Sequence, residues 1–261
     1  MSRFVYGVNP VLEALKAHPK DVVRVLVERG HEGRSSRGAD RVAQAAADAG
    51  VRVEDVPHGD LAHRSRSGVH QGVGAELTQF RYAELEDVLS AIEGPAFLLV
   101  LDGVTDPQNL GAIVRSAEVL GAGALVLPRD RSAPVTPAVI RASAGATAHL
   151  PIVQVVNLTR ALGEMKQRGY WIVGLAPAGS SEFQELPALE RAVLVVGSED
   201  KGARPLVRET CDFLVRIPQR GRVESLNASV AAAIGIYGLR ERLVRASKPP
   251  GSGGPATPAS S

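Results

Sequence analysis

The stretch from Val215 to Gly235 constrains the fold of this chain more than any other segment. It begins as a short apolar strand, turns at Pro218 and Gly221, presents Ser225 and Asn227, and continues directly into a run of alanines. Helices seldom begin with polar side chains beside small packing residues unless the preceding loop holds something. We therefore predict a rigid loop carrying two polar side chains at the mouth of a tightly packed helix.

Two further segments, Asp102–Gly121 and Val195–Gly202, share this order of strand, polar turn and helix. Phe97–Leu101 is a near-continuous apolar run, which is typical of a parallel strand buried on both faces. Repeated strand–helix units predict a parallel sheet with helices on both faces. Because open α/β sheets bind ligands at the carboxyl ends of their strands, we expect the three polar turns to form one crevice.

The expected elements follow from hydrophobic periodicity and from turn residues. We predict helices over residues 8–15, 39–49, 83–92, 109–120, 137–147, 158–167 and 226–244, and strands over residues 22–27, 51–53, 69–75, 97–101, 124–127, 170–175, 192–196 and 213–217. This pattern divides the chain into a small α/β unit at 1–78, a linker at 79–94, a larger α/β unit at 95–246 and a disordered tail rich in Pro, Gly and Ser at 247–261.

Composition restricts the class of protein. A net charge of +2 and an isoelectric point near 8.8 permit a nucleic-acid partner without requiring one. The single cysteine, Cys211, excludes an internal disulfide and a cysteine-based metal site. No apolar stretch approaches the roughly 20 residues that span a bilayer, and the N-terminus lacks a signal-peptide core. We therefore expect a cytoplasmic protein without membrane contact.

Residues 29–38 form a basic, glycine-rich segment in the first unit. It is either a solvated connection between a strand and a helix, or a flexible arm that contacts phosphates through Arg29, Arg34 and Arg37. The loop after residue 217 is also basic, with Arg220 and Arg222.

The crevice lacks several familiar motifs. Gly197–Gly202 has the wrong glycine spacing for a dinucleotide turn and no Walker A ending. Ser198 and Ser225 stand outside any nucleophile elbow, and the histidines are scattered without metal-ligand spacing. These observations argue against a dinucleotide, a nucleoside triphosphate, a metal ion and serine-hydrolase chemistry.

The polar residues of the crevice each permit two interpretations. Arg115 is either a surface salt-bridge residue or a clamp for a phosphodiester, and its apolar neighbours, Val119 among them, leave it little solvent-facing arc. Asp106 is best explained as a helix cap. Asn109, Asn227 and Ser225 can cap helices without losing a second role, and Glu199 can complement a helix dipole. The alanines from Ala231 are best explained by helix packing.

Three motifs in this order resemble the SpoU (TrmH) branch of the SPOUT RNA 2′-O-methyltransferases. They are Asn-Leu-Gly-Ala-Ile-Val-Arg-Ser-Ala from Asn109, Val-Gly-Ser-Glu-Asp-Lys-Gly from Val196, and the stretch from Ile217 to Ala231. At the front of the chain, Val5–Leu15 and His70–Val73 are similar to the L30e-like substrate domain of RlmB-type enzymes, which methylate a guanosine ribose of the large-subunit rRNA.

The resemblance implies an α/β-knot domain, with a deep trefoil knot and a mostly parallel sheet, behind a small L30e-like domain. It also implies that S-adenosylmethionine binds in the knot without a metal ion, against Gly197, Ser198, Ile217 and Leu226. Family members pair through the knot domain, so the resemblance implies a homodimer with the last helix at its interface.

The implied catalytic set is Asn109, Arg115, Glu199, Ser225 and Asn227, and the implied substrate is structured RNA, namely a guanosine of 23S rRNA. Our hypothesis is that Arg115 grips the neighbouring phosphate and fixes the 2′-oxygen, since an arginine is a reluctant base. Within the motif, Asp200 and Lys201 depart from the glycine that is more usual in the family. The alternatives are methylation of tRNA or of another rRNA position, and an RNA-binding factor without catalytic activity.

Overall fold

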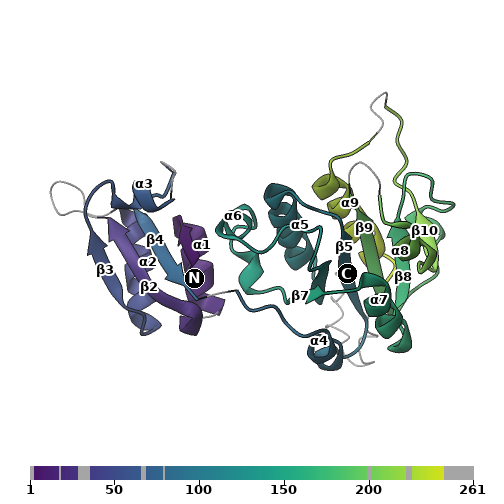
Figure 1. Ribbon diagram of the computed structural model, residues 1–261, viewed down its shortest axis with the longest axis horizontal. Coiled ribbons are helices and arrows are strands. Elements are labelled where there is room, and N and C mark those ends of the chain that lie inside the picture. The colour runs from purple at the N-terminus through teal and green to yellow at the C-terminus, as the bar shows by residue number, and fades with distance from the viewer. Residues whose placement is uncertain are drawn as a thin grey trace, which may run out of the picture.

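The computed structural model describes residues 3–17, 19–28, 36–65, 69–78, 80–198, 202–221 and 225–243, which form two separate β-sheets flanked by helices (Figure 1). The predicted tail at 247–261 lies outside the described residues. No helix within those ranges is both long and apolar enough to cross a membrane.

The N-terminal sheet is mixed and has the strand order β1-β4-β2-β3. β4 pairs antiparallel with β1 and β2, whereas β2 and β3 are parallel. The elements of this unit are β1 (Arg3–Tyr6), α1 (Val8–Ala17), η1 (Pro19–Asp21), β2 (Val22–Glu28), α2 (Arg37–Asp48), β3 (Val53–Val56), α3 (Asp60–Ser65) and β4 (Val73–Leu77).

The side chains of β2 alternate between the two faces of the small sheet. Val25 and Val27 are buried in the cluster that also holds α1 and α2, whereas Leu26 packs with Leu61 of α3. Side chains of a strand point to opposite faces in turn, so this alternation places α3 on the face opposite to α1 and α2. The predicted strand at 69–75 starts later than expected because Gln71, with φ 56°, and Gly72 form a left-handed turn ahead of it.

The second sheet is parallel throughout and has the order β10-β8-β9-β5-β6-β7. Its strands are β5 (Ala96–Asp102), β6 (Ala124–Pro128), β7 (Ile152–Val155), β8 (Trp171–Leu175), β9 (Arg191–Gly197) and β10 (Phe213–Val215). The helices of this unit are α4 (Leu85–Ala91), α5 (Pro107–Val119), α6 (Pro137–Ala142), η2 (Ala146–Ala148), α7 (Leu158–Gln167), η3 (Phe183–Glu185), α8 (Pro205–Glu209) and α9 (Ala228–Arg240).

Helices cover both faces of the second sheet, as its apolar strands predict. Leu99 and Leu101 of β5 pack in the cluster that includes α5, α6 and α9, whereas Leu98 and Val100 pack with α4, α7 and α8. The strand order reverses between β5 and β9, because the chain moves outward from β5 to β6 and β7 and then returns to the other side. In such sheets the crevice for ligands opens at the carboxyl ends of the strands beside this reversal.

Close backbone crossings occur at this carboxyl edge. A Cβ atom added to Gly197 would lie 2.0 Å from the amide nitrogen of Ala203, and one added to Gly179 would lie 2.5 Å from the carbonyl carbon of Val215. Gly179 is therefore required by the approach of a distant stretch of backbone, and Gly197 by the return of the loop that follows it.

The segment after β8 contacts two later parts of the chain. Ala176 donates its amide hydrogen to Val215 O at 2.9 Å, and Arg216 donates to Ser181 O at 2.9 Å. Farther along the same connection, Leu189 donates to Arg242 O at 2.9 Å. The connection between β8 and β9 thus holds both the end of β10 and the residues that follow α9.

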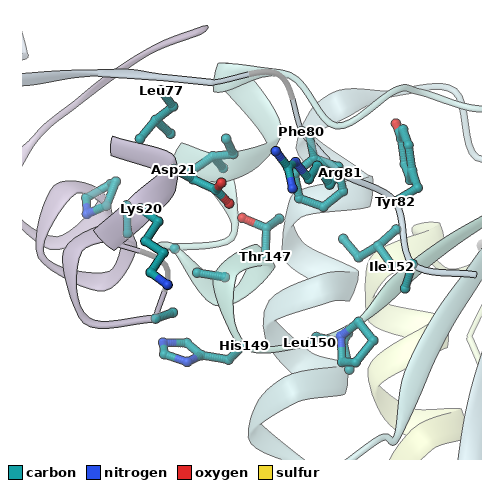
Figure 2. A pocket seen from close by; sticks show the side chains of 18 of the residues that line it. Lys20, Asp21, Leu77, Phe80, Arg81, Tyr82, Thr147, His149, Leu150 and Ile152 are labelled. Atoms are coloured by element: carbon teal, nitrogen blue, oxygen red, sulfur yellow. The ribbon is translucent and has the colours of Figure 1, made fainter. Parts of the chain in front are cut away.

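Two polar contacts join the N-terminal unit to the helices of the second sheet. His149 Nε2 lies 2.7 Å from Glu13 Oε2, and the Arg141 guanidinium lies over the Tyr6 ring, 4.6 Å from its centroid. A cavity of about 760 Å³ lies between the two units. Figure 2 shows Lys20 on the N-terminal side of this cavity and Ile152 on the opposite side. Because β7 begins at Ile152, this cavity adjoins the amino edge of the second sheet, away from the carboxyl-edge crevice.

Candidate active site

A second cavity, of about 370 Å³, lies at the carboxyl edge of the large sheet. Its walls come from the residues that follow β8, β9 and β10 and from the start of α9. It contains every residue predicted to contact the donor, together with one member of the predicted catalytic set: Gly197, Ser198, Ile217, Leu226 and Ser225. The structure therefore brings together residues that lie far apart in the sequence.

The loop after β9 is closed at its base by two backbone hydrogen bonds. Ser198 donates its amide hydrogen to Gly202 O at 3.1 Å, and Gly202 donates to Ser198 O at 2.9 Å. The predicted catalytic residue Glu199 and the unusual pair Asp200 and Lys201 lie outside the described residues.

A buried carboxylate fixes the next part of the chain. Asp102, at the end of β5, is 3% exposed and accepts hydrogen bonds from Arg204 N at 2.8 Å and from Arg204 Nε at 2.7 Å. Burying a carboxylate without a partner would be strongly unfavourable, so this pair locks the segment after β9 onto the end of β5. The sequence marks Asp102 only as the first residue of a polar turn after an apolar strand. It does not predict the contact with Arg204.

Asn109 and Asn227 link the start of α5 to the start of α9. Asn227 Nδ2 donates to Asn109 Oδ1 at 3.0 Å, while Asn227 Oδ1 accepts from Ser229 N at 2.9 Å and caps α9. Asp106 caps α5 by accepting from Gln108 N at 3.1 Å, as the sequence predicted. Two helix N-termini with their positive dipole ends therefore meet beside the cavity, which favours an anion there.

α5 and α9 lie side by side and run in the same direction. Their starts are joined through the two asparagines, and at their ends Arg240 Nη1 of α9 donates to Leu120 O, the C-cap of α5. Their solvent-facing sides consequently form one continuous surface.

Arg115 lies on this surface and not in the cavity. Its side chain is exposed, and because α5 begins at Pro107, two residues before the predicted start, Arg115 lies farther from the helix start than expected. Arg115 follows Asn109 by six helix positions, which corresponds to a rise of about 9 Å and a rotation of about 240°. The expectation that its neighbours leave little solvent-facing arc was wrong in part, because Val119, one turn away, is 68% exposed.

The predicted RNA-binding arginines are only partly described. Arg37 is exposed on the first turn of α2, and Arg220 is exposed in the loop after β10, next to Gln219 of the carboxyl-edge cavity. Arg29, Arg34 and Arg222 lie outside the described residues. Within the described part of the chain, no group of His, Cys, Asp and Glu side chains could hold a metal ion.

Sequence reasoning missed several residues of the cavity wall. Ala231 lines the cavity, although we attributed the alanines to packing alone. Ala176–Ala178 follow β8 and carry no polar side chain that could have marked them as site residues. Cys211 also lines the cavity, and burial raises the pKa of its thiol to about 11, with a further contribution from Asp212. That thiol is therefore protonated near neutral pH.

Comparison with known proteins places both units. The model of the SpoU rRNA Methylase family matches residues 96–237, and a model described as RNA 2′-O ribose methyltransferase substrate binding matches residues 4–83.

Three similar proteins illustrate the relationship. The 23S rRNA (guanosine-2′-O-)-methyltransferase RlmB of Pseudomonas putida is 41% identical over 249 residues, which cover 92% of this chain and 97% of that protein. The AdoMet complex of the SpoU methyltransferase AviRb from Streptomyces viridochromogenes has a TM-score of 0.77 at 25% identity, covering 92% of this chain and 90% of the other. An AdoMet-bound rRNA methyltransferase from Sinorhizobium meliloti has a TM-score of 0.77 at 26% identity, covering 94% and 88%. With its parallel sheet, its carboxyl-edge cavity and these matches, the chain belongs to the SpoU family of rRNA methylases.

Proposed function

We propose that this protein transfers a methyl group from S-adenosylmethionine to the 2′-hydroxyl of a guanosine ribose in 23S rRNA. The observation that carries the proposal is the carboxyl-edge cavity, where the predicted donor-binding residues meet beside the N-termini of α5 and α9. The relative from Pseudomonas putida is named for this activity and is matched over nearly its whole length. If rRNA is the substrate, the protein acts in the cytoplasm.

The cavity fits S-adenosylmethionine. Its volume of about 370 Å³ lies within the range of small-molecule sites, and most of its wall is apolar, as an adenosine requires. The peptide groups of Ile217 and Leu226 make no backbone hydrogen bond to any residue within the described ranges, so they are available to the polar edge of a ligand. When bound there, the donor supplies an electrophilic methyl group on a sulfonium centre.

The protein's own contribution is to position the ribose and to ease removal of its proton. We assign Asn109, Asn227 and Ser225 to the surface against which the 2′-hydroxyl is held, and we keep Glu199 in the catalytic set on the resemblance of its motif. Arg115 would grip the adjacent phosphate in a bidentate manner and so orient the 2′-oxygen. Positioning of this kind can supply several orders of magnitude in rate.

A homodimer through α5 and α9 forms part of this proposal. Val230, Ile234 and Tyr237 form an exposed apolar stripe on α9, and Val119 of α5 lies on the adjoining helix, with exposures between 41% and 68%. Apolar stripes at helical spacing on the surface are characteristic of protein interfaces. Since Arg115 lies one turn from Val119, pairing of two copies here would place Arg115 at their contact.

We further propose that residues 1–78 bind the RNA through an L30e-like fold, that 79–94 link the two units, and that 95–246 form an α/β-knot domain. The knot is supported by the close approach of Val215 and Arg216 to Gly179 and by the hydrogen bonds from the β8–β9 connection to both β10 and the residues that follow α9. Arg29, Arg34, Arg37, Arg220 and Arg222 are the candidate phosphate contacts, because each lies in a basic loop or at its border.

The test uses a strain that lacks the gene, with 2′-O-methyl groups mapped across its 23S rRNA and tRNA. The proposal expects one 23S guanosine to lose its methyl group and to regain it when the wild-type chain is restored. The Arg115→Lys variant, which keeps the charge but loses the bidentate fork, is expected to lower turnover at least about tenfold with RNA affinity retained. A missing methyl group in tRNA alone would refute the assignment to rRNA, and full turnover of Arg115→Lys would refute the clamp.

A further inference from the structure

One charged side chain lines the carboxyl-edge cavity among the described residues, and it belongs to Arg208 of α8. The guanidinium of Arg208 makes no hydrogen bond or ion pair with a described residue, in contrast to Arg204, which is held by Asp102. The segment that carries Arg208 is therefore anchored through Arg204, while Arg208 itself remains available to a ligand.

The cavity has two sides that lie on opposite faces of the sheet. Arg208 and Cys211 line the side next to α8, where a Cβ atom added to Gly174 would lie 2.7 Å from Cys211 Sγ. Leu226, Ala228 and Ala231 line the side of α9, whose N-cap Asn227 is bonded to Asn109. The proposed function places the ribose beside Asn109 and Asn227. Transfer therefore requires the methyl group to lie on the α9 side of the cavity.

S-adenosylmethionine has one anionic group, the α-carboxylate of its methionyl arm, and its sulfonium and ammonium groups are cationic. We propose that Arg208 binds this carboxylate, so that the methionyl arm points toward α8 and the sulfonium methyl group is directed toward α9. This inference rests on the proposed function and adds a specific contact to it. A guanidinium offers a carboxylate two parallel hydrogen bonds, which fix direction as well as strengthen binding.

The contact implies a selectivity that can be measured. S-adenosylhomocysteine has the carboxylate, whereas 5′-methylthioadenosine has the same thioether and adenosine but lacks the amino-acid group. Decarboxylated S-adenosylmethionine differs from the methyl donor by the carboxylate alone. Arg208 is expected to favour the carboxylate-containing member of each pair.

Isothermal titration of the full-length protein with these four ligands tests the inference. Arg208→Ala is expected to weaken S-adenosylhomocysteine and S-adenosylmethionine about fivefold to tenfold, because the arginine is exposed and the pair is partly screened. The affinity for 5′-methylthioadenosine and for the decarboxylated donor should change less than about twofold, which isolates the coupling as in a double-mutant cycle. Arg208→Lys should restore part of the loss.

Arg160→Ala is the matched control, since Arg160 is an exposed helix residue paired with Glu164 on α7 and does not line the cavity. It should leave all four affinities unchanged, and thermal melting checks that each variant is folded. Equal losses for 5′-methylthioadenosine and S-adenosylhomocysteine would show that Arg208 contacts the adenosine and would overturn the inference, as would no loss for either. Wild-type protein that binds none of the four ligands would instead remove the proposed function, and this inference with it.

Discussion

Substitutions at Asn227 and Asn109 can separate helix capping from the link between the two helices. Asn227 Oδ1 accepts from Ser229 N and Ser229 Oγ at 2.9 and 2.6 Å, and Asn227 Nδ2 donates to Asn109 Oδ1 at 3.0 Å. Serine caps helices about as well as asparagine but is too short to reach across to α5. Asn227→Ser therefore removes the link and keeps the cap, Asn227→Ala removes both, and Asn109→Ala removes the link from its other end.

The two contacts have different expected magnitudes. Loss of an N-cap costs about 1 kcal/mol, and loss of one exposed side-chain hydrogen bond costs about 0.5 to 1 kcal/mol. Asn227→Ala should therefore lose about 1.5 to 2 kcal/mol in free energy of unfolding, and Asn227→Ser and Asn109→Ala about 0.5 to 1 kcal/mol each. For a domain of this size, each kcal/mol lowers the melting temperature by about 2 to 4 °C.

Urea unfolding followed by tryptophan fluorescence measures this directly, because the only tryptophan, Trp171, lies on β8 of the sheet that carries the site. Methyl transfer should fall at least about tenfold in all three variants, since each loses the link that positions the crevice. If Asn227→Ser is as unstable as Asn227→Ala, the capping argument is wrong. If Asn227→Ser keeps full methyl transfer, the link between the asparagines has no role in the reaction.

Three further outcomes follow from the geometry. Gly197→Ala places a Cβ 2.0 Å from Ala203 N, so donor affinity should fall more than about tenfold and stability by at least about 2 kcal/mol; unchanged titration and melting curves would contradict this. Ile234→Asp introduces a charge into the apolar stripe and should convert the proposed dimer into a monomer by light scattering, while a dimer that persists would exclude this face. Because burial raises the pKa of Cys211 from 9.0 to about 11, its thiol should react slowly with a disulfide reagent at pH 8 and faster as pH approaches 11. The thiol of the unfolded chain ionises at lower pH than the buried thiol of the folded chain. The stability that the thiol contributes is therefore present below pH 9.0 and is lost as the pH rises to about 11. Rapid labelling at pH 8 would refute the burial of Cys211.

The strands of the large sheet could be predicted because each is an apolar run with its own local signal. The expected strand at 97–101 is confirmed as Ala96–Asp102, and the helix at 83–92 as Leu85–Ala91. β1 was missed because its four residues form a strand only through pairing with β4, about seventy residues away, and hydrophobic periodicity cannot reveal such long-range pairing. The helix expected at 137–147 ends at Ala142, because Ala144 and Gly145 take positive φ values of 53° and 90°.

Part of the cavity wall could be predicted from residue types and motifs, and the rest depends on positions that only the fold brings together. Ser225 and the glycine at 197 had recognisable residue types, and both line the cavity. Arg208 lies on a helix of five residues, too short for a periodic signal, and its relation to the cavity depends on the contact between Arg204 and Asp102 across the sheet. Arg115 shows the reverse case, since its motif marked it while the fold of one chain leaves it outside the cavity.

The donor side and the acceptor side of the crevice are ordered by different parts of the fold. On the donor side, the backbone of Val215 and Arg216 lies so close to Gly179, and the end of the loop after β9 so close to Gly197, that the backbone itself fixes the cavity wall. On the acceptor side, the starts of the two capped helices are joined through side chains, by the hydrogen bond between Asn109 and Asn227. A side-chain link can be broken and remade far more readily than a backbone crossing, so adjustment to RNA should occur at α5 and α9. Pairing of two copies over these same helices would then couple dimer formation to the geometry of the acceptor, with Arg115 as the residue most directly affected.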